Sequence, residues 1–81
     1  MSKIAVIGAG SVAFSMSLIQ DFALTKGLSG CTVTFMDINQ DRLNMVYSLA
    51  SRYIKELDMD LNLEKTTSRE EAIRGADFVI N

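Results

Sequence analysis

The sequence predicts an α/β fold with a parallel sheet, and three observations support this prediction. Short apolar segments rich in β-branched residues alternate along the 81 residues with longer segments whose apolar residues recur every three or four positions. Residues 3–7 and 76–80 are almost wholly apolar, as strands covered on both faces are. The alternation of strands with helices favours right-handed crossovers, which make the strands parallel.

The first strand is expected over residues 3–7, after which Ser11 can serve as the N-cap of a helix. Val12 and Met16 begin a broad apolar face at helical spacing, which predicts a helix that packs on the sheet. Gly27 lies where a left-handed C-terminal cap is expected.

The second strand is expected over residues 31–36, and Asn39 can cap the helix that follows it. Apolar residues repeat at steps of three and four over residues 43–57, which is the clearest helical periodicity in the chain. Residues 61–65 alternate between apolar and polar side chains, a pattern typical of a half-exposed third strand.

The last two elements are a short helix and a fourth strand. Ser68 and Glu71 have the spacing of a capping box, with the serine as N-cap and the glutamate at the third helical position. Gly75 can end this helix, and residues 76–80 then form the fourth strand. Because a domain seldom finishes at the tip of a central strand, we expect residues 1–81 to be the N-terminal part of a longer protein.

Composition excludes several classes of function. The net charge is −2 without a cluster of Lys or Arg, so neither nucleic acid nor a membrane surface is an expected partner. One cysteine and no histidine predict neither a disulfide framework nor a Cys/His metal cluster. The apolar runs are too short for a signal peptide or a membrane span, and a cytoplasmic location fits these features.

The first strand runs directly into a G-x-G-x-x-A turn, which is the most informative motif of the chain. Gly8 permits a tight turn, Gly10 lets a diphosphate approach the main chain, and Ala13 lets the following helix pack closely on the sheet. The free N–H groups at the start of this helix would face the phosphates. The motif therefore predicts a dinucleotide cofactor.

Asp37 ends the second strand, 24 positions beyond Ala13 and close to the spacing of about 20 expected for a ribose-binding acid. A carboxylate there accepts hydrogen bonds from ribose hydroxyls and repels a 2′-phosphate, so NAD is favoured over NADP. The alternative is that Asp37 only caps the next helix, for which Asn39 is the better candidate. The motif and the acid together predict a Rossmann-type parallel sheet with strand order 3-2-1-4, truncated after the fourth strand.

Further residues have two possible roles each. Arg42 either lies against the adenine or is a solvated residue of the first helical turn. Asn81, at the carboxyl edge of the sheet, is a candidate cofactor contact or a plain surface residue. Thr66 and Thr67 end the third strand near the expected adenine, but a turn and cap role is favoured for them.

Four strings together resemble a known family. They are Ile7-Gly8-Ala9-Gly10-Ser11 with Phe14 close behind, Leu28-Ser29-Gly30, Met36-Asp37-Ile38 followed by Asp41-Arg42-Leu43, and Ala76-Asp77-Phe78-Val79-Ile80-Asn81. Over its whole length the chain resembles the N-terminal segment of family 4 glycoside hydrolases, in particular the α-glucosidase/α-galactosidase branch. The glycine motif is shared with many dehydrogenases, whereas the strings around Phe14 and Asp37 are more specific.

The resemblance implies a glycosidase that holds NAD and a divalent metal such as Mn²⁺. In that family, hydride leaves C3 of the sugar for NAD⁺, a base takes the C2 proton, the glycosidic oxygen is eliminated, water adds and the hydride returns. The family's metal-binding Cys and His and its catalytic Tyr lie beyond residue 81. No catalytic or metal-ligating residue is therefore expected here, and the chain alone should be inactive. The cofactor residues that carry over are Gly8, Gly10, Ser11, Val12 and Asp37.

Two other functions are open: the cofactor domain of a lactate/malate-type NAD-dependent dehydrogenase, and a nucleotide-binding module without catalysis. For the full-length enzyme we expect a small glycoside as substrate. The fourth strand would have an unpaired, apolar edge, so we also expect a homo-oligomer.

Overall fold

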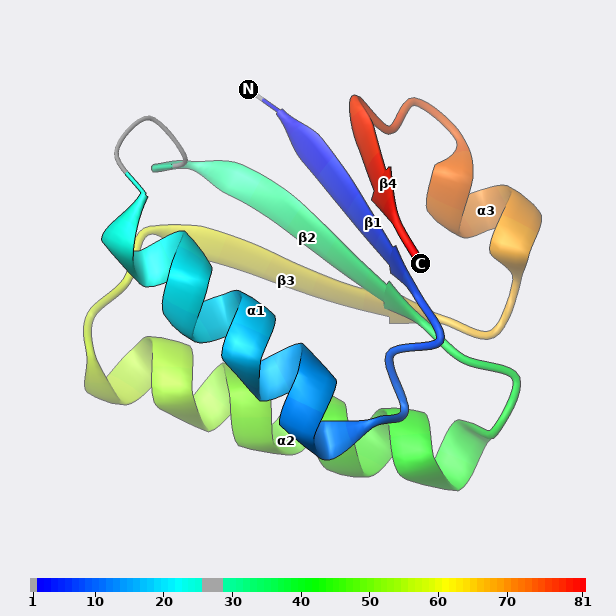
Figure 1. Ribbon diagram of the computed structural model, residues 1–81, viewed down its shortest axis with the longest axis horizontal. Helices are drawn as coiled ribbons and strands as arrows, with labels where there is room; N and C mark the ends of the chain where they lie inside the picture. The colour runs from blue at the N-terminus through cyan, green and yellow to red at the C-terminus, as the bar shows by residue number, and fades with distance from the viewer. Residues whose placement is uncertain (1, 26–28) are drawn as a thin grey trace.

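The computed structural model describes residues 2–25 and 29–81 and contains a four-stranded parallel sheet of order β3-β2-β1-β4 (Figure 1). This arrangement confirms the predicted fold class and strand order. Pairing in register runs from Lys3 opposite Thr32 to Ile7 opposite Met36. The elements are β1 (Lys3–Ile7), α1 (Val12–Leu24), β2 (Cys31–Met36), α2 (Gln40–Glu56), β3 (Leu61–Thr66), α3 (Arg69–Ile73) and β4 (Phe78–Ile80).

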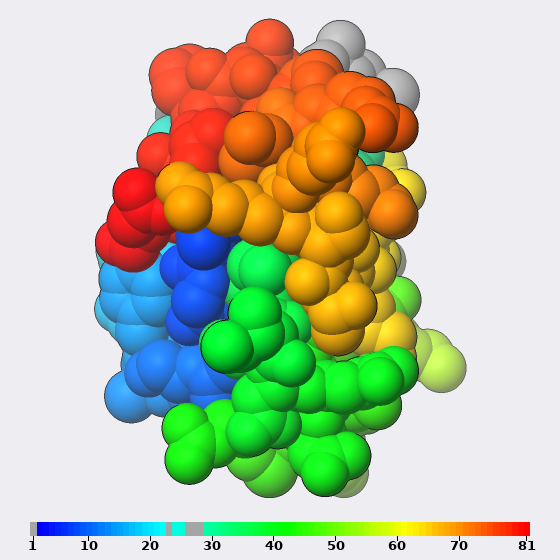
Figure 2. All heavy atoms as spheres, turned by 90° about the vertical axis from the view of Figure 1, so that its right-hand side faces the viewer, coloured from blue at the N-terminus to red at the C-terminus, as the bar shows by residue number. Residues whose placement is uncertain are grey.

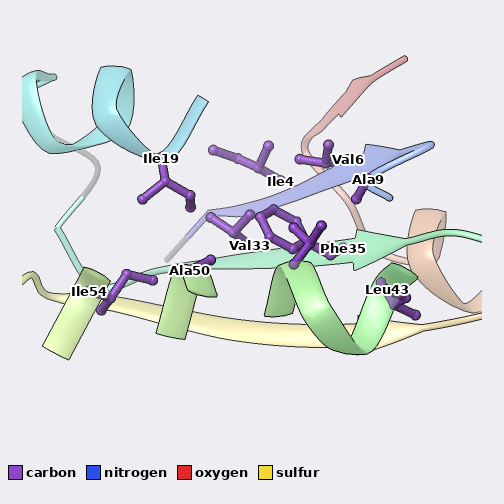
Figure 3. Packing of buried hydrophobic residues seen from close by; sticks show 10 residues of the cluster. Ile4, Val6, Ala9, Ile19, Val33, Phe35, Leu43, Ala50 and Ile54 are labelled. Carbon is purple, nitrogen blue, oxygen red and sulfur yellow. The ribbon is translucent and has the colours of Figure 1, made fainter. Parts of the chain in front are cut away.

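Helices cover both faces of the sheet, α1 and α2 on one and α3 on the other (Figure 1). Alternate residues of each central strand face opposite layers, because successive side chains of a strand point to opposite faces. Val6 and Phe35 therefore pack toward α1 and α2, whereas Ala5 and Met36 pack toward Ala72 of α3. Figure 3 shows the larger cluster, which consists of Ile4, Val6, Ala9, Ile19, Val33, Phe35, Leu43, Val46, Ala50 and Ile54.

The predicted caps of α2 and α3 are present. Asn39 Oδ1 accepts a hydrogen bond from Arg42 N at 3.0 Å, and Ser68 Oγ accepts one from Glu71 N at 3.2 Å. The capping box is only half formed, because the N–H of Ser68 donates to Thr66 Oγ1 at 3.0 Å. This bond confirms the turn role expected of Thr66.

Three other expectations about helix ends have different outcomes. Gly75 follows α3 with φ at +71°, as expected for a glycine that ends a helix. Ser11 is the N-cap residue of α1, but its side chain makes no capping hydrogen bond. The helix ends at Leu24 with Thr25 as its C-cap, and Gly27 lies outside the described residues.

The fourth strand is shorter and more exposed than its sequence predicts. β4 begins at Phe78 rather than at residue 76, because Asp77 is used outside the strand: its N–H donates to Lys3 O and its Oδ2 accepts from Lys3 N, both at 2.8 Å. In the described part of the chain β4 pairs only with β1. The side chains of Phe78 and Val79 are therefore 60% and 48% exposed instead of covered on both faces.

Within residues 2–25 and 29–81, no helix is both long and apolar enough to cross a membrane.

Candidate functional site

The carboxyl ends of the parallel strands meet at one edge of the sheet, and the predicted motif residues gather there. Figure 2 looks onto this edge, where the turn after β1 (blue), the connection after β2 (green) and the start of α3 (orange) lie side by side. The turn after β1 contains the two motif glycines, and Asp37 directly follows β2. The strands bring together residues that are far apart in the sequence.

The glycine turn is anchored on the last residue of β2. The N–H groups of Gly8 and Ala9 both donate to the carbonyl oxygen of Met36, each at 2.9 Å. Gly8 has φ at +78°, a left-handed conformation that favours glycine, so its predicted role in a tight turn is confirmed.

Asp37 is held between the glycine turn and the start of α2. Its Oδ2 accepts a hydrogen bond from Gly10 N at 2.8 Å, and its Oδ1 accepts one from Asn39 N at 2.8 Å. The carboxylate is therefore aimed at the turn. The side chain that caps α2 is that of Asn39. The geometry therefore disfavours the alternative in which Asp37 serves only as the helix cap. A carboxylate has about four acceptor positions, so both oxygens keep the capacity to accept further hydrogen bonds.

The close approach of Asp37 also explains why a glycine occupies position 10. A Cβ atom built on Gly10 would lie 2.6 Å from Asp37 Oδ2, 2.9 Å from its Cγ and 3.2 Å from Arg42 Cβ. The absence of a side chain at Gly10 was predicted to let a diphosphate approach the main chain here. In the structure, the space beside the Gly10 Cα is taken by protein side chains, so any residue larger than glycine would displace the carboxylate.

The start of α1 lies next to this pair. Ser11 is exposed and Val12, the first helical residue, is half-buried. The packing role predicted for Ala13 is wrong for the described residues, because its side chain is exposed. The small residue that packs beneath the turn is Ser15, which is fully buried and donates from its Oγ to Ala9 O at 2.7 Å.

An apolar hollow of about 240 Å³ opens beside Asp37. Four of its six residues were not among the predicted site residues, and two of these four, Ile38 and Arg69, lie outside the strands. Ile38 is 86% exposed although it is a large apolar side chain, and Arg69 is the first residue of α3, a position where helices favour acids. These two irregularities are the signals that could have identified them. The hollow is lined by Ile7, Gly8, Met36, Asp37, Ile38 and Arg69.

The remaining candidates lie at the same edge but are less closely tied to the site. Arg42 is exposed, and its Cβ is near Gly10, but it does not line the hollow. Asn81 is exposed and directly follows β4. The roles suggested for both residues stay predictions.

The part of the chain that the structure describes contains no group of three or more His, Cys, Asp or Glu side chains that could hold a metal ion.

A family model and two curated relatives indicate one family. Residues 3–81 match the model of the family described as family 4 glycosyl hydrolase. The chain is 30% identical over 79 residues to an α-galactosidase of Rhizobium meliloti and 33% identical over 79 residues to an α-glucosidase of Erwinia rhapontici. Each match covers 98% of this chain but only 16% and 17% of the respective relative.

A third relative has a different activity. The chain is 32% identical over 82 residues to a glycerol-3-phosphate dehydrogenase [NAD(P)⁺] of Clostridium perfringens. The match covers 99% of this chain and 23% of that enzyme.

Solved structures share the fold. A 6-phospho-β-glucosidase from Thermotoga maritima, solved with NAD and glucose-6-phosphate, superposes with a TM-score of 0.81 at 24% identity, covering 95% of this chain and 18% of that one. A 6-phospho-α-glucosidase from gut microorganisms, in complex with NAD and Mn²⁺, superposes with a TM-score of 0.81 at 19% identity. This match covers 96% of this chain and 18% of that one.

Proposed function

The chain belongs to family 4 of the glycosyl hydrolases, and we propose that it forms the adenosine-binding half of an NAD site. We infer that residues 1–81 are the N-terminal half of a Rossmann domain, and that the whole enzyme hydrolyses O-glycosidic bonds of a small glycoside. The relatives named α-galactosidase and α-glucosidase support the reaction, and the NAD in the similar structures supports the cofactor.

The observation that carries this proposal is the arrangement of Asp37. Two backbone N–H groups, from Gly10 and Asn39, fix its carboxylate at the carboxyl edge of the sheet. Since each oxygen can accept another hydrogen bond, the group is suited to two neighbouring hydroxyls of a ribose. Its negative charge disfavours a 2′-phosphate at the same place, which favours NAD over NADP.

The hollow beside Asp37 has the character that an adenine ring requires. Its lining is mostly apolar, with Ile38 on one side and the guanidinium-bearing Arg69 at the start of α3. A flat, electron-rich ring can pack against an aliphatic side chain and stack on a guanidinium. We therefore assign the adenine to this hollow and give Arg69, together with Ile38, a part in its recognition.

The diphosphate is assigned to the turn between β1 and α1. The N–H groups of Gly8 and Ala9 are already used by Met36, and the N–H of Gly10 is used by Asp37. The helix start at positions 11–14 keeps N–H groups outside the helical bonds, and of these we assign Ser11 and Val12, at the positive end of the 13-residue α1, to the phosphates. Ser11 adds a hydroxyl that no helix cap uses.

The chemistry that NAD supplies when bound is the acceptance and return of a hydride. This chain's residues contribute binding and orientation, and none of them is proposed as a catalytic acid or base. We infer a divalent metal, Mn²⁺, for the whole enzyme because two similar structures hold it. Since the described residues form no metal-binding group, no ligand and no step of the reaction is assigned to this chain.

Calorimetric titration of the chain with NAD⁺, NADP⁺ and adenosine tests the proposal. NAD⁺ and adenosine should bind measurably and NADP⁺ more weakly. Asp37→Asn should reduce adenosine affinity about tenfold to a hundredfold, because hydrogen bonds to a charged group contribute about 1.5–3 kcal/mol.

Asp41→Asn is the matched control, since it removes an equal charge from an exposed residue of the first turn of α2. Its adenosine affinity should stay within about twofold of the unmodified chain. Equal losses in both variants, or the same affinity for NADP⁺ as for NAD⁺, would contradict the role of Asp37.

A dehydrogenase is the second candidate, favoured by the similarity to glycerol-3-phosphate dehydrogenase. Both candidates use the same cofactor site, so binding data do not separate them. Assays of the whole gene product separate them. Release of nitrophenol from a nitrophenyl glycoside without net formation of NADH supports the glycosidase. Stoichiometric formation of NADH from a hydroxylated substrate supports the dehydrogenase. A nucleotide-binding module without catalysis would show neither activity.

A further inference from the structure

One peptide unit of the glycine turn is held at both of its ends by different elements. Its carbonyl oxygen, on Ala9, accepts a hydrogen bond from Ser15 Oγ of α1 at 2.7 Å. Its N–H, on Gly10, donates to Asp37 Oδ2 after β2 at 2.8 Å. Together the two bonds fix the direction in which this peptide points.

Ser15 occupies a place where helix packing alone would favour an apolar residue. Its side chain has 0% exposure, and serine is a weaker helix former than alanine. Its hydroxyl donates to Ala9 O, in the turn that precedes the helix. Ala9 is also fully buried, so its carbonyl oxygen would lose its partner if the hydroxyl were removed.

The peptide needs such support because it precedes a glycine. Glycine tolerates both signs of φ, so rotation of the Ala9–Gly10 peptide has a low intrinsic cost. Rotation would remove the N–H donor from Asp37 and turn a carbonyl oxygen toward the carboxylate. The same oxygen would then repel an anionic ligand at the turn.

We propose that Ser15 is a positioning residue, which locks the Ala9–Gly10 peptide with its N–H toward Asp37 and its carbonyl away from the diphosphate. The consequence for the diphosphate rests on the proposed function, whereas the orientation of the peptide does not. Ser15 acts through the turn and touches no ligand itself.

The test combines amide hydrogen exchange of the ¹⁵N-labelled chain with calorimetry. Ser15→Ala should shift the Gly10 amide signal and raise its exchange rate at least about tenfold. The affinity for ADP-ribose should fall about tenfold, which is the effect of about 1.4 kcal/mol. Adenosine, which has no phosphate, should lose at most about threefold. Ser15→Cys, with a weaker donor of similar size, should give intermediate values for each quantity.

Two controls separate positioning from general destabilisation. Ser17→Ala removes an exposed hydroxyl from the same helix and should leave the Gly10 amide unchanged. Ile54→Val weakens the core at the last turn of α2 and should preserve the ratio of ADP-ribose to adenosine affinity.

An unchanged Gly10 amide in Ser15→Ala would overturn the inference, as would equal losses for both ligands. If Ser15→Ala does not fold, the same comparison is made with Ser15→Cys. If the unmodified chain binds neither ADP-ribose nor NAD⁺, the proposed function fails, and the exchange data alone decide the role of Ser15.

Discussion

The backbone N–H of Gly10 donates to Oδ2 of Asp37 at 2.8 Å, across 27 positions of sequence. This bond makes the second glycine of the motif and the acid after β2 one structural unit. A side chain at position 10 would collide with the carboxylate, since its Cβ would lie 2.6 Å from Oδ2.

Gly10→Ala should therefore lower both stability and ligand affinity. Relief of the collision requires Asp37 to move, which we expect to cost about 1–3 kcal/mol in the free energy of unfolding. Adenosine affinity should fall at least about tenfold, as measured by urea unfolding and calorimetry on the same protein. Gly75→Ala is the control without a collision: Gly75 lies beyond α3, and apart from its chain neighbours no described heavy atom lies within 4 Å of the added Cβ. Unlike Gly10, Gly75 has a left-handed backbone, with φ at +71°, so an alanine there is strained. It should lose stability without loss of affinity.

Asn39→Ala should separate the stability of α2 from the geometry of the site. The variant loses the side-chain cap on Arg42 N, which is expected to reduce the free energy of unfolding by about 1 kcal/mol. It keeps the backbone N–H that donates to Asp37. Adenosine affinity should therefore change by less than about threefold. A loss as large as that of Asp37→Asn would mean that the cap of α2, and not only the backbone, holds the carboxylate.

Arg69→Ala should weaken binding of the adenine ring. The stacking of a guanidinium on an aromatic ring contributes about 0.5–2 kcal/mol, so adenosine affinity should fall about threefold to thirtyfold. Titrations of Arg42→Ala under the same conditions decide between the two arginines. Arg52→Ala, which breaks an exposed pair with Glu56 in the last turns of α2, should bind like the unmodified chain. A loss confined to Arg42→Ala would assign the adenine to the start of α2 instead.

The chain should self-associate through β4. This strand pairs with β1 on one side, and no further strand follows it in the described part of the sheet, so its other edge can add a strand from a second copy. Val79 is 48% exposed, and Val79→Lys should shift the population toward monomer in sedimentation equilibrium. Leu49→Lys, at an exposed apolar position on α2, should not. A monomer at high concentration of the unmodified chain would refute this prediction.

The fold was predictable because its signals are local. Apolar runs and apolar periodicity indicated where the strands and the two long helices lie, and the caps at Asn39 and Ser68 depend only on residues three positions away. The location of Asp37 at the carboxyl edge of the sheet could also be predicted, because the residue directly follows a strand. Its hydrogen bond with Gly10 could not be predicted, since the distance between two strand ends depends on how the strands pair.

Other parts of the site depend on packing that no short segment encodes. Arg69 lines the hollow only because the short connection after β3 places the start of α3 beside the ends of β1 and β2. Ala13 occupies the expected motif position but stays exposed, and the buried contact beneath the turn comes instead from Ser15. Motif spacing predicted which residues gather at one edge of the sheet, whereas the partner of each hydrogen bond is decided by tertiary structure.

The double acceptor role of Met36 has a consequence for how the molecule folds. Gly8 and Ala9 take their shape from a carbonyl oxygen that lies far along the chain, so the turn cannot be ordered by the first thirty residues alone. Nucleation there would require closure of a long loop, which is slow compared with formation of a helix. The glycine turn should thus become ordered late, after β1 and β2 have paired. A nascent chain that still lacks β2 would carry the glycine motif in an unstructured state.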